Sequence, residues 1–345
     1  MKTCGSYSVA SVASSISGGA DDRLPPVTPV DPKAWELYLQ GLDFQQQMTP
    51  SGFDQAADAF RSSLDAAPDY SLARVGLAAA WLAGSAAGGQ GPARVEDARD
   101  TLKAVLTFDP DLPEALGLLA YIRRQYDWDL QGALLDSERA VQLNPGDPEL
   151  MSGASIAMFS LGRFDTAGEL LQAAVSQDPL NLSRRLRLGL LQEFSGDYDA
   201  ALSSYRQIIG LNPEFPAASA FRARVKILQE KPESALRESE LETDPFWKRY
   251  SKILALSALE RHEEADELLE QMIREEGHRA AYQVAEAHAF RGDSEAAFEW
   301  LARAYDQKDG GLREILGNRF LQNLHGDHRW EGLLTRLGLP LDLNQ

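Results

Sequence analysis

Apolar residues recur every three or four positions through most of the chain, and this spacing predicts amphipathic helices that come in pairs. A proline follows each of the first six pairs, at intervals of 42, 35, 34, 34 and 32 residues. An alanine near the start of the second helix of each pair keeps almost the same period. Because two residue types share one period, the pattern indicates a repeated helix–turn–helix unit. The prolines are Pro68, Pro110, Pro145, Pro179, Pro213 and Pro245, and the alanines are Ala56, Ala98, Ala133, Ala167, Ala201, Ala235, Ala265 and Ala297.

The turns within the pairs carry residues that begin and end helices. Asp31 and Pro32 suit the N-cap and the first position of the first helix. Gly162 and Gly196 are expected to end helices in the left-handed conformation, and the aspartate after each of them is expected to cap the next helix. Repeats six and seven, about residues 216–244 and 246–276, lack such a glycine, so their limits are less sharply defined.

These patterns predict an all-α fold, namely a right-handed α-solenoid of about eight helix pairs over residues 31–311. Residues 312–345 are expected to form capping helices, because a terminal repeat must cover its exposed apolar face. Residues 1–30 are rich in Ser, Ala and Gly and then in Pro, and they are expected to form a disordered tail or linker.

The period of about 34 residues is that of tetratricopeptide repeats, which the chain resembles. Four segments extend the resemblance: 34–41 (AWELYLQG), 126–129 (YDWD), 161–165 (LGRFD) and 338–340 (GLP). They are similar to the tetratricopeptide module at the carboxyl end of bacterial signalling proteins that also contain nucleotide cyclase, protein kinase or winged-helix parts. The resemblance covers about residues 31–340 and implies a binding module. Residues 1–30 are too few to form one of those other domains, so their activities are not carried over.

The net charge of −18 argues against binding to nucleic acid through this module, because phosphates would be repelled. A protein or peptide partner that is neutral or basic is expected instead. No stretch reaches the roughly 18 consecutive apolar residues of a membrane-spanning helix, so we expect no membrane association and a cytoplasmic location.

The chain offers little that suggests catalysis. His325 and His328 are close in sequence, but a metal site needs three or four converging ligands, and no third ligand has a recognisable spacing. His288 stands where these repeats usually place an inward aromatic side chain, so packing is the favoured interpretation. No glycine-rich phosphate loop follows a strand. We therefore expect a non-enzymatic protein without a metal or cofactor.

The residues expected to bind a partner come from the first helices of the repeats, which line the concave side of a right-handed array. Aromatic side chains beside Arg and Gln combine apolar area with directed hydrogen bonds, as peptide-binding grooves do. Packing of the same aromatic residues between neighbouring helices is the alternative interpretation. The expected partner-binding residues are Trp35, Tyr38, Gln45, Tyr121, Arg124, Gln125, Ile156, Phe159, Arg187, Leu190, Glu193, Phe194, Tyr282 and Glu286.

The sequence thus favours a scaffold or adaptor that binds a partner protein or peptide on its concave face. The alternative is the sensor or regulatory half of a bacterial signalling enzyme or transcription regulator, as the resemblance implies. The two functions share one fold and differ only in what the repeats are attached to.

Overall fold

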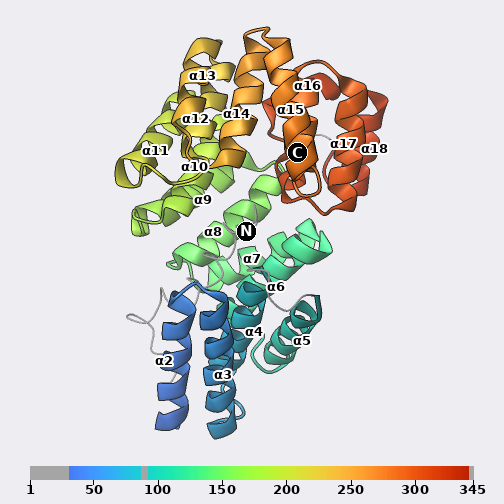
Figure 1. The fold of residues 1–345 in the computed structure, drawn as a ribbon. Coiled ribbons are helices and arrows are strands. Elements are labelled where there is room, and N and C mark those ends of the chain that lie inside the picture. Colours follow the sequence, from blue (N-terminus) through green and yellow to red (C-terminus); the bar gives the residue numbers. More distant parts are fainter. Residues whose placement is uncertain (1–30, 87–91, 342–345) are drawn as a thin grey trace. The chain divides into compact units, whose positions relative to one another are not determined.

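The computed structural model describes residues 31–86 and 92–341. Within these ranges the chain forms helices α2 to α18 with three short π or 3-10 segments, and it contains no strand (Figure 1). The predicted all-α fold is confirmed. The tail expected over residues 1–30 lies outside the described residues.

Eight consecutive helix pairs account for most of the described chain, as the proline and alanine periods predict. In each pair the first helix is called A and the second B. The pairs are α2 (Pro32–Gln46) and α3 (Pro50–Ala66), α4 (Ser71–Ala86) and α5 (Pro92–Phe108), α6 (Pro113–Ile122) and α7 (Leu130–Leu143), α8 (Pro148–Ser160) and α9 (Phe164–Gln177), α10 (Leu182–Phe194) and α11 (Tyr198–Leu211), α12 (Ala218–Leu228) and α13 (Pro232–Leu241), α14 (Pro245–Ala258) and α15 (His262–Glu276), and α16 (Ala281–Phe290) and α17 (Ser294–Asp306).

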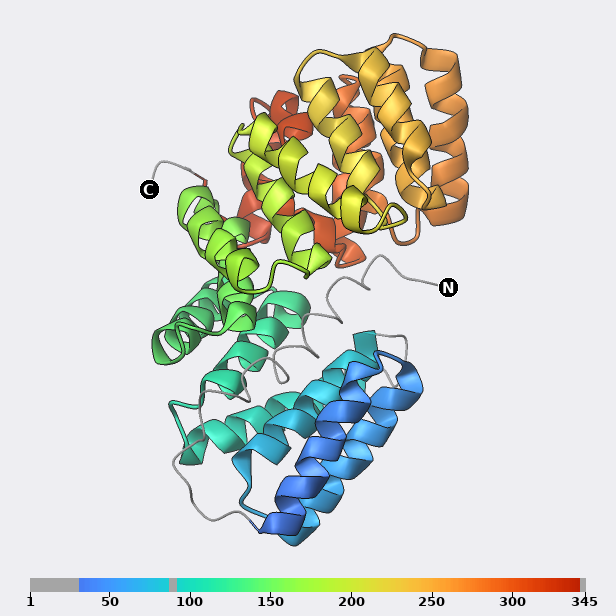
Figure 2. The same ribbon diagram turned by 90° about the vertical axis from the view of Figure 1, so that its left-hand side faces the viewer.

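The chain divides into two compact units, with the boundary between Ala157 and Met158 inside α8. In the N-terminal unit each helix from α2 to α7 contacts the next one along the chain. In the C-terminal unit the same is true from α9 to α17, and Figure 2 shows these helices as successive layers. This order of contacts is typical of a repeat array, in which each unit buries its apolar face only against its neighbours.

The periodic alanines are completely buried positions of the array. All eight have a relative exposure of 0 %, and each lies in the B helix of its repeat. Two packed helices approach to about 8–10 Å between axes, and a small residue at the crossing permits the closer distances.

The turns confirm part of the prediction and correct the rest. Gly162 and Gly196 have φ values of 80° and 83°. The Asp197 carboxylate accepts a hydrogen bond from the Ala200 amide at 3.1 Å and caps α11 as expected. Asp165 does not cap α9, because the N-cap position is taken by Arg163, whose side chain makes no cap bond.

Two glutamates replace glycine in the less regular repeats. Glu230 and Glu260 adopt positive φ values of 59° and 58° at the ends of α12 and α14. A non-glycine residue in this conformation costs roughly 1 kcal/mol, which packing of the surrounding repeats must offset. The helix limits of repeats six and seven are therefore set by tertiary packing more than by local sequence.

The C-terminal end departs from the predicted capping helices. In the described part of the region 312–345, where capping helices are expected, the chain forms two 3-10 turns, η2 (Gly310–Glu314) and η3 (Arg319–Leu324), before the single helix α18 (His328–Arg336). The side chains of Asp309 and Asn318 each accept a bond of 3.0 Å from the backbone amide two residues later. Such side-chain bonds favour turns over continued helix.

The helix crossings give the first prediction. Ala167→Asp and Ala201→Asp should each lower the free energy of unfolding by more than about 3 kcal/mol, because each places an unpaired carboxylate at a completely buried crossing. Urea titration followed by circular dichroism measures the effect. The matched control is Ala302→Asp on the exposed side of α17. Equal loss of stability in all three variants would show that the assigned repeat register is wrong.

Candidate partner-binding face

The fourteen expected partner-binding residues all lie on A helices or on the turn that follows one of them. We call this set the A-helix face. The N-terminal unit holds Trp35, Tyr38 and Gln45 on α2, Tyr121 on α6, Arg124 and Gln125 on η1 (Arg123–Asp127), and Ile156 on α8. The C-terminal unit holds Phe159 on α8, Arg187, Leu190, Glu193 and Phe194 on α10, and Tyr282 and Glu286 on α16.

Repeat one shows both exposed and packed members of this face. The Trp35 side chain is partly exposed, at 38 %. Tyr38 is buried, and its ring lies 5.3 Å from Tyr70 and 5.8 Å from Phe60 between centroids. Gln45 is also buried, and neither amide atom of its side chain has a hydrogen-bond partner among the described residues. Trp35 is thus the member of this repeat that a partner could contact directly.

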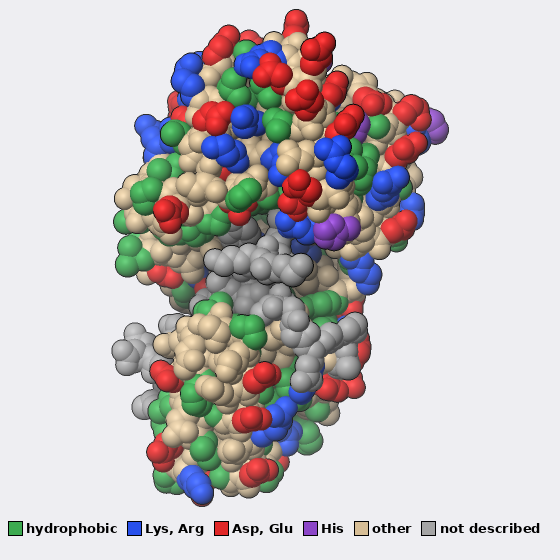
Figure 3. All heavy atoms as spheres, in the orientation of Figure 1, with side chains coloured by type: hydrophobic (Ala, Val, Ile, Leu, Met, Phe, Trp, Pro, Cys, Tyr) green, Lys and Arg blue, Asp and Glu red, His purple; other side chains and the backbone are tan. Residues whose placement is uncertain are grey.

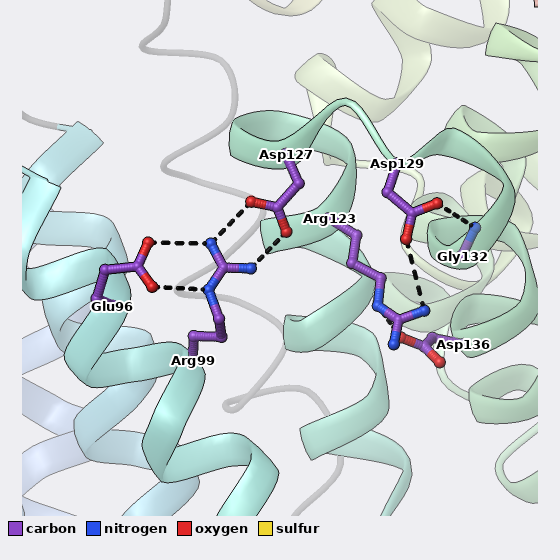
Figure 4. Close-up of polar contacts among 7 residues, drawn as sticks. All are labelled: Glu96, Arg99, Arg123, Asp127, Asp129, Gly132 and Asp136. Carbon is purple, nitrogen blue, oxygen red and sulfur yellow. Dashed lines mark hydrogen bonds and ion pairs between the residues drawn. The ribbon is translucent and has the colours of Figure 1, made fainter. Parts of the chain in front are cut away.

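Repeat three contains a π-helical turn that the sequence did not predict. The turn η1 follows α6 directly and ends at Trp128, whose φ of 62° is left-handed. Arg99 on α5 fixes this turn from one side, because its guanidinium contacts both Glu96 and Asp127 (Figure 4). Such π turns often occur at functional sites.

Arg123 fixes the other side of the same turn. Its Nε lies 3.1 Å from Asp136 on α7, and its Nη1 lies 3.7 Å from Asp129, as Figure 4 shows. The other oxygen of Asp129 caps α7 by accepting a bond of 2.9 Å from the Gly132 amide. Arg123 is therefore engaged with acidic residues of its own repeat, whereas its neighbour Arg124 is buried against Tyr121, with its guanidinium 5.6 Å from the ring centroid.

A cavity of about 50 Å³ opens beside Tyr121 and Arg124, between α6, α7 and α8. Most of its lining is apolar or small, and two glycines, Gly117 and Gly153, contribute no side chain to it. The charged residues of the lining are Glu114, Arg124 and Glu149. The structure therefore brings two of the expected residues together around a hole that a partner's side chain could enter.

A second cavity of about 260 Å³ lies in the same unit, between α3 and α4. Its wall includes Trp81, whose ring has the guanidiniums of Arg61 and Arg94 at 5.9 and 5.4 Å. Arg61 pairs with Asp58. This mixture of charges indicates no particular class of ligand.

The A-helix face of the C-terminal unit centres on a buried charge cluster. Arg224 on α12 donates to Glu193 on α10 at 3.0 Å and to Glu286 on α16 at 2.8 Å. All three side chains are at most 4 % exposed. Arg224 also donates to the Tyr250 hydroxyl on α14. Burial raises the pKa of Glu193, and Arg224 opposes this rise. The cluster joins four successive A helices through one guanidinium.

The chain's own C-terminal segment covers this cluster. The Asn318 amide donates to the Tyr282 hydroxyl at 2.7 Å and to the Glu286 carboxylate. Phe320 places its ring 4.7 Å from the Arg224 guanidinium. Residues 310–324, the η2–η3 segment, therefore lie on the A-helix face of the C-terminal unit.

The same segment also reaches the aromatic members of the face. Phe194 stacks on Phe159 at 5.3 Å between centroids. A Cβ on Gly317 would clash with the rings of Phe194 and Phe164, so the backbone of the segment touches these rings directly.

Two further members of the face lie on the same helix, α10. Leu190 is buried, and Arg187 interacts electrostatically with Glu314 of η2. A role of these residues in partner binding stays a prediction, and it would require the segment to move.

Sequence reasoning placed Glu193 and Glu286 on one face but missed Arg224, which binds both of them, and Asn318, which binds Glu286. An arginine inside the apolar stretch of α12 was the available signal, since a buried charge needs a partner. Three arginines lie close together in the sequence at 184–187 (RRLR), but they form no common basic patch, because Arg184 is buried and pairs with Asp178 at 3.0 Å.

The histidines do not converge on a common site. The ring of His325 lies 4.5 Å from Trp330, His328 is exposed beside Asp327, and His288 is half-buried beside Asp293. In the described part of the chain no group of three or more His, Cys, Asp or Glu could hold a metal ion. None of the described helices is long and apolar enough to span a membrane.

On the side drawn in Figure 3, surface charge does not single out a binding patch. Acidic and basic side chains are interspersed on this side. Many are paired, for example Arg249 with Glu275 at 2.8 Å on α14 and α15. The charge of a partner therefore has to be argued from the lining of a particular site.

Removal of the central guanidinium gives the second prediction. Arg224→Ala should lower the free energy of unfolding by about 3–5 kcal/mol, because Glu193 and Glu286 would be left buried without their cation. Arg206→Ala, at an exposed position of α11, is the control and should have a small effect. A loss no larger than the control's would mean that the cluster is not buried as described.

Glu314 gives the third prediction. Burial, with a contribution from Glu286, raises the pKa of Glu314 to about 7, and Arg224 opposes the rise. The native state then keeps a proton that the unfolded chain loses near pH 4–5, so the stability from this group falls as the pH rises from about 5 to about 7. Glu314→Gln should flatten that fall by about 2 kcal/mol in urea titrations across this range. Glu331→Gln at an exposed site is the control, and an unchanged slope for Glu314→Gln would contradict the assignment.

Comparison with known proteins agrees with this geometry. Residues 186–245, from α10 to the start of α14, match the family model of the tetratricopeptide repeat. A tetratricopeptide repeat protein from Parabacteroides merdae has a similar structure, with a TM-score of 0.52 and 14 % identity, over 77 % of this chain and 99 % of that one. PilW, a type IV pilus biogenesis factor, gives a TM-score of 0.50 and 12 % identity, over 61 % of this chain and 92 % of that one.

Curated relatives match over short stretches. BBSome complex member BBS4 from Bos taurus is 30 % identical over 80 residues, which are 23 % of this chain and 15 % of that protein. Cellulose synthase operon protein C from Pseudomonas fluorescens is 28 % identical over 131 residues, or 36 % of this chain and 10 % of that protein. The chain thus spans only a small part of either relative. Its matched repeats and its helical array show that the chain contains tetratricopeptide repeats and has the fold of a tetratricopeptide repeat protein.

Proposed function

We propose that the chain is a non-enzymatic scaffold that binds a partner protein or peptide on the concave face formed by its A helices. The observation that carries this proposal is the η2–η3 segment, a non-α-helical stretch of polypeptide that already lies on the A-helix face of the C-terminal unit. A surface that holds one such segment through ring contacts and side-chain hydrogen bonds is chemically suited to hold another.

The N-terminal unit contains an exposed member of this face and a cavity that two other members line. Trp35 is partly exposed there, and Tyr121 and Arg124 line the cavity between α6 and α8. Among the described residues, the η2–η3 contacts given above all fall in the C-terminal unit. We therefore assign partner binding first to the A helices of the N-terminal unit.

Site-specific photocrosslinking tests this proposal and gives the fourth prediction. A benzophenone amino acid is placed in turn at Trp35 and Gln125 on the A-helix face, and at Leu135, which is 67 % exposed on the B helix α7. Irradiation in native lysate should give cross-linked partner peptides from positions 35 and 125 that excess unlabelled protein competes away. Position 135 should give none.

The positions of the cross-links decide between the faces. Competed cross-links from position 135 alone would move binding to the B helices. An absence of competed cross-links at positions 35 and 125 in lysate that contains a co-purifying partner would contradict the proposal.

A further inference from the structure

Gly153 is a glycine inside helix α8 for which packing gives no reason. A glycine in a helix interior costs roughly 0.5–1 kcal/mol relative to alanine. Gly41, Gly76 and Gly189 have a steric reason, because a Cβ there would clash with the ring of Phe60 or Tyr205. A Cβ on Gly153 would meet nothing within 4 Å.

The open space beside Gly153 is the cavity between α6, α7 and α8. Gly210 and Gly332 also have open surroundings, but neither of them lines this cavity. Its volume of about 50 Å³ is several times the roughly 10–15 Å³ that one water needs. The cavity therefore has room for a few heavy atoms, the size of a short aliphatic side chain.

We propose that this cavity is an anchor site for a valine- or leucine-sized side chain of a peptide partner, and that a basic residue lies next to that side chain in the peptide. The proposal rests on the proposed function, because it specifies which peptides the A-helix face of the N-terminal unit binds. It adds the chemical class of the ligand and the residues that select it.

The lining explains the aliphatic preference. Leu118, Leu150 and Ala157 contribute apolar walls, and Gly153 leaves open space beside α8. Gly117 lets Leu150 pack directly against the backbone of α6, because a Cβ there would clash with the Leu150 side chain. Burial of apolar area stabilises a complex, so a side chain that fills the cavity binds more tightly than one that stays outside. A large aromatic side chain would exceed the available space.

The charges of the lining explain the basic neighbour. Glu114 and Glu149 lie in the first turns of α6 and α8, and both border the cavity. Arg124 is the cation of the lining, and its guanidinium already lies over the Tyr121 ring. The formal charges of the lining, two carboxylates and one guanidinium, sum to a negative value, which favours Lys or Arg beside the anchor and disfavours Asp or Glu.

The fifth prediction uses a displayed library of random dodecapeptides, selected against the full-length chain, as the probe. Enriched peptides should share an aliphatic residue next to Lys or Arg. Fluorescence anisotropy then gives the dissociation constant of the strongest peptide for each variant. Gly153→Ala should weaken binding about twofold, and Gly153→Leu at least tenfold, because the new side chain occupies the cavity.

Gly332→Leu is the matched control, since it adds the same side chain to an open helical glycine of α18 and should leave binding unchanged. The melting temperature of each variant checks that it is folded. If Gly153→Leu does not fold, the double variant Glu114→Gln, Glu149→Gln provides the test. It should weaken the basic peptide at least fivefold at low salt and reduce the salt dependence of its affinity.

The outcomes separate the two proposals. Peptides that bind equally well to wild type and to folded Gly153→Leu would overturn the anchor site and leave binding on the A-helix face intact. Enrichment of acidic peptides, or an unchanged affinity of the Glu114→Gln, Glu149→Gln variant, would overturn the basic preference. A selection that enriches no peptide, together with photocrosslinks from position 135 alone, would overturn the proposed function itself.

Discussion

The structure depends on close contact between successive helices at a single small residue. In each of the eight repeats an alanine of the B helix is completely buried, and the same residue type recurs at this position along the whole array. A repeat cannot bury its apolar face alone, so every crossing stabilises two neighbours at once.

The two units use their A-helix faces differently. In the C-terminal unit the face encloses Arg224 with Glu193 and Glu286, and the chain's own η2–η3 segment lies over them. In the N-terminal unit the corresponding side chains surround a cavity beside Gly153. One face is covered by a segment of the same chain, and the other borders a cavity of about 50 Å³. A single repeat pattern thus produces two A-helix faces with different surroundings.

The sequence predicted the parts of this structure that local chemistry determines. The period of the alanines gave the repeat register, and Gly162 and Gly196 marked turns, because each depends on residues close in sequence. The π turn before Trp128 was not predictable, since Arg99 on a different helix fixes it. The cluster of Glu193, Arg224 and Glu286 joins residues up to 93 positions apart, which no local pattern reveals. The open space beside Gly153 was not predicted, because the sequence does not show whether a glycine within a helix faces packed side chains or a cavity.

Hydrogen–deuterium exchange with and without a selected peptide tests the central claim most directly, namely that the A helices of the N-terminal unit form the recognition face. The account predicts that the peptide slows exchange in residues 113–125 and 148–157, which border the cavity, and leaves α5 and the exposed side of α7 unchanged. Protection confined to the B helices, or to the C-terminal unit alone, would contradict it.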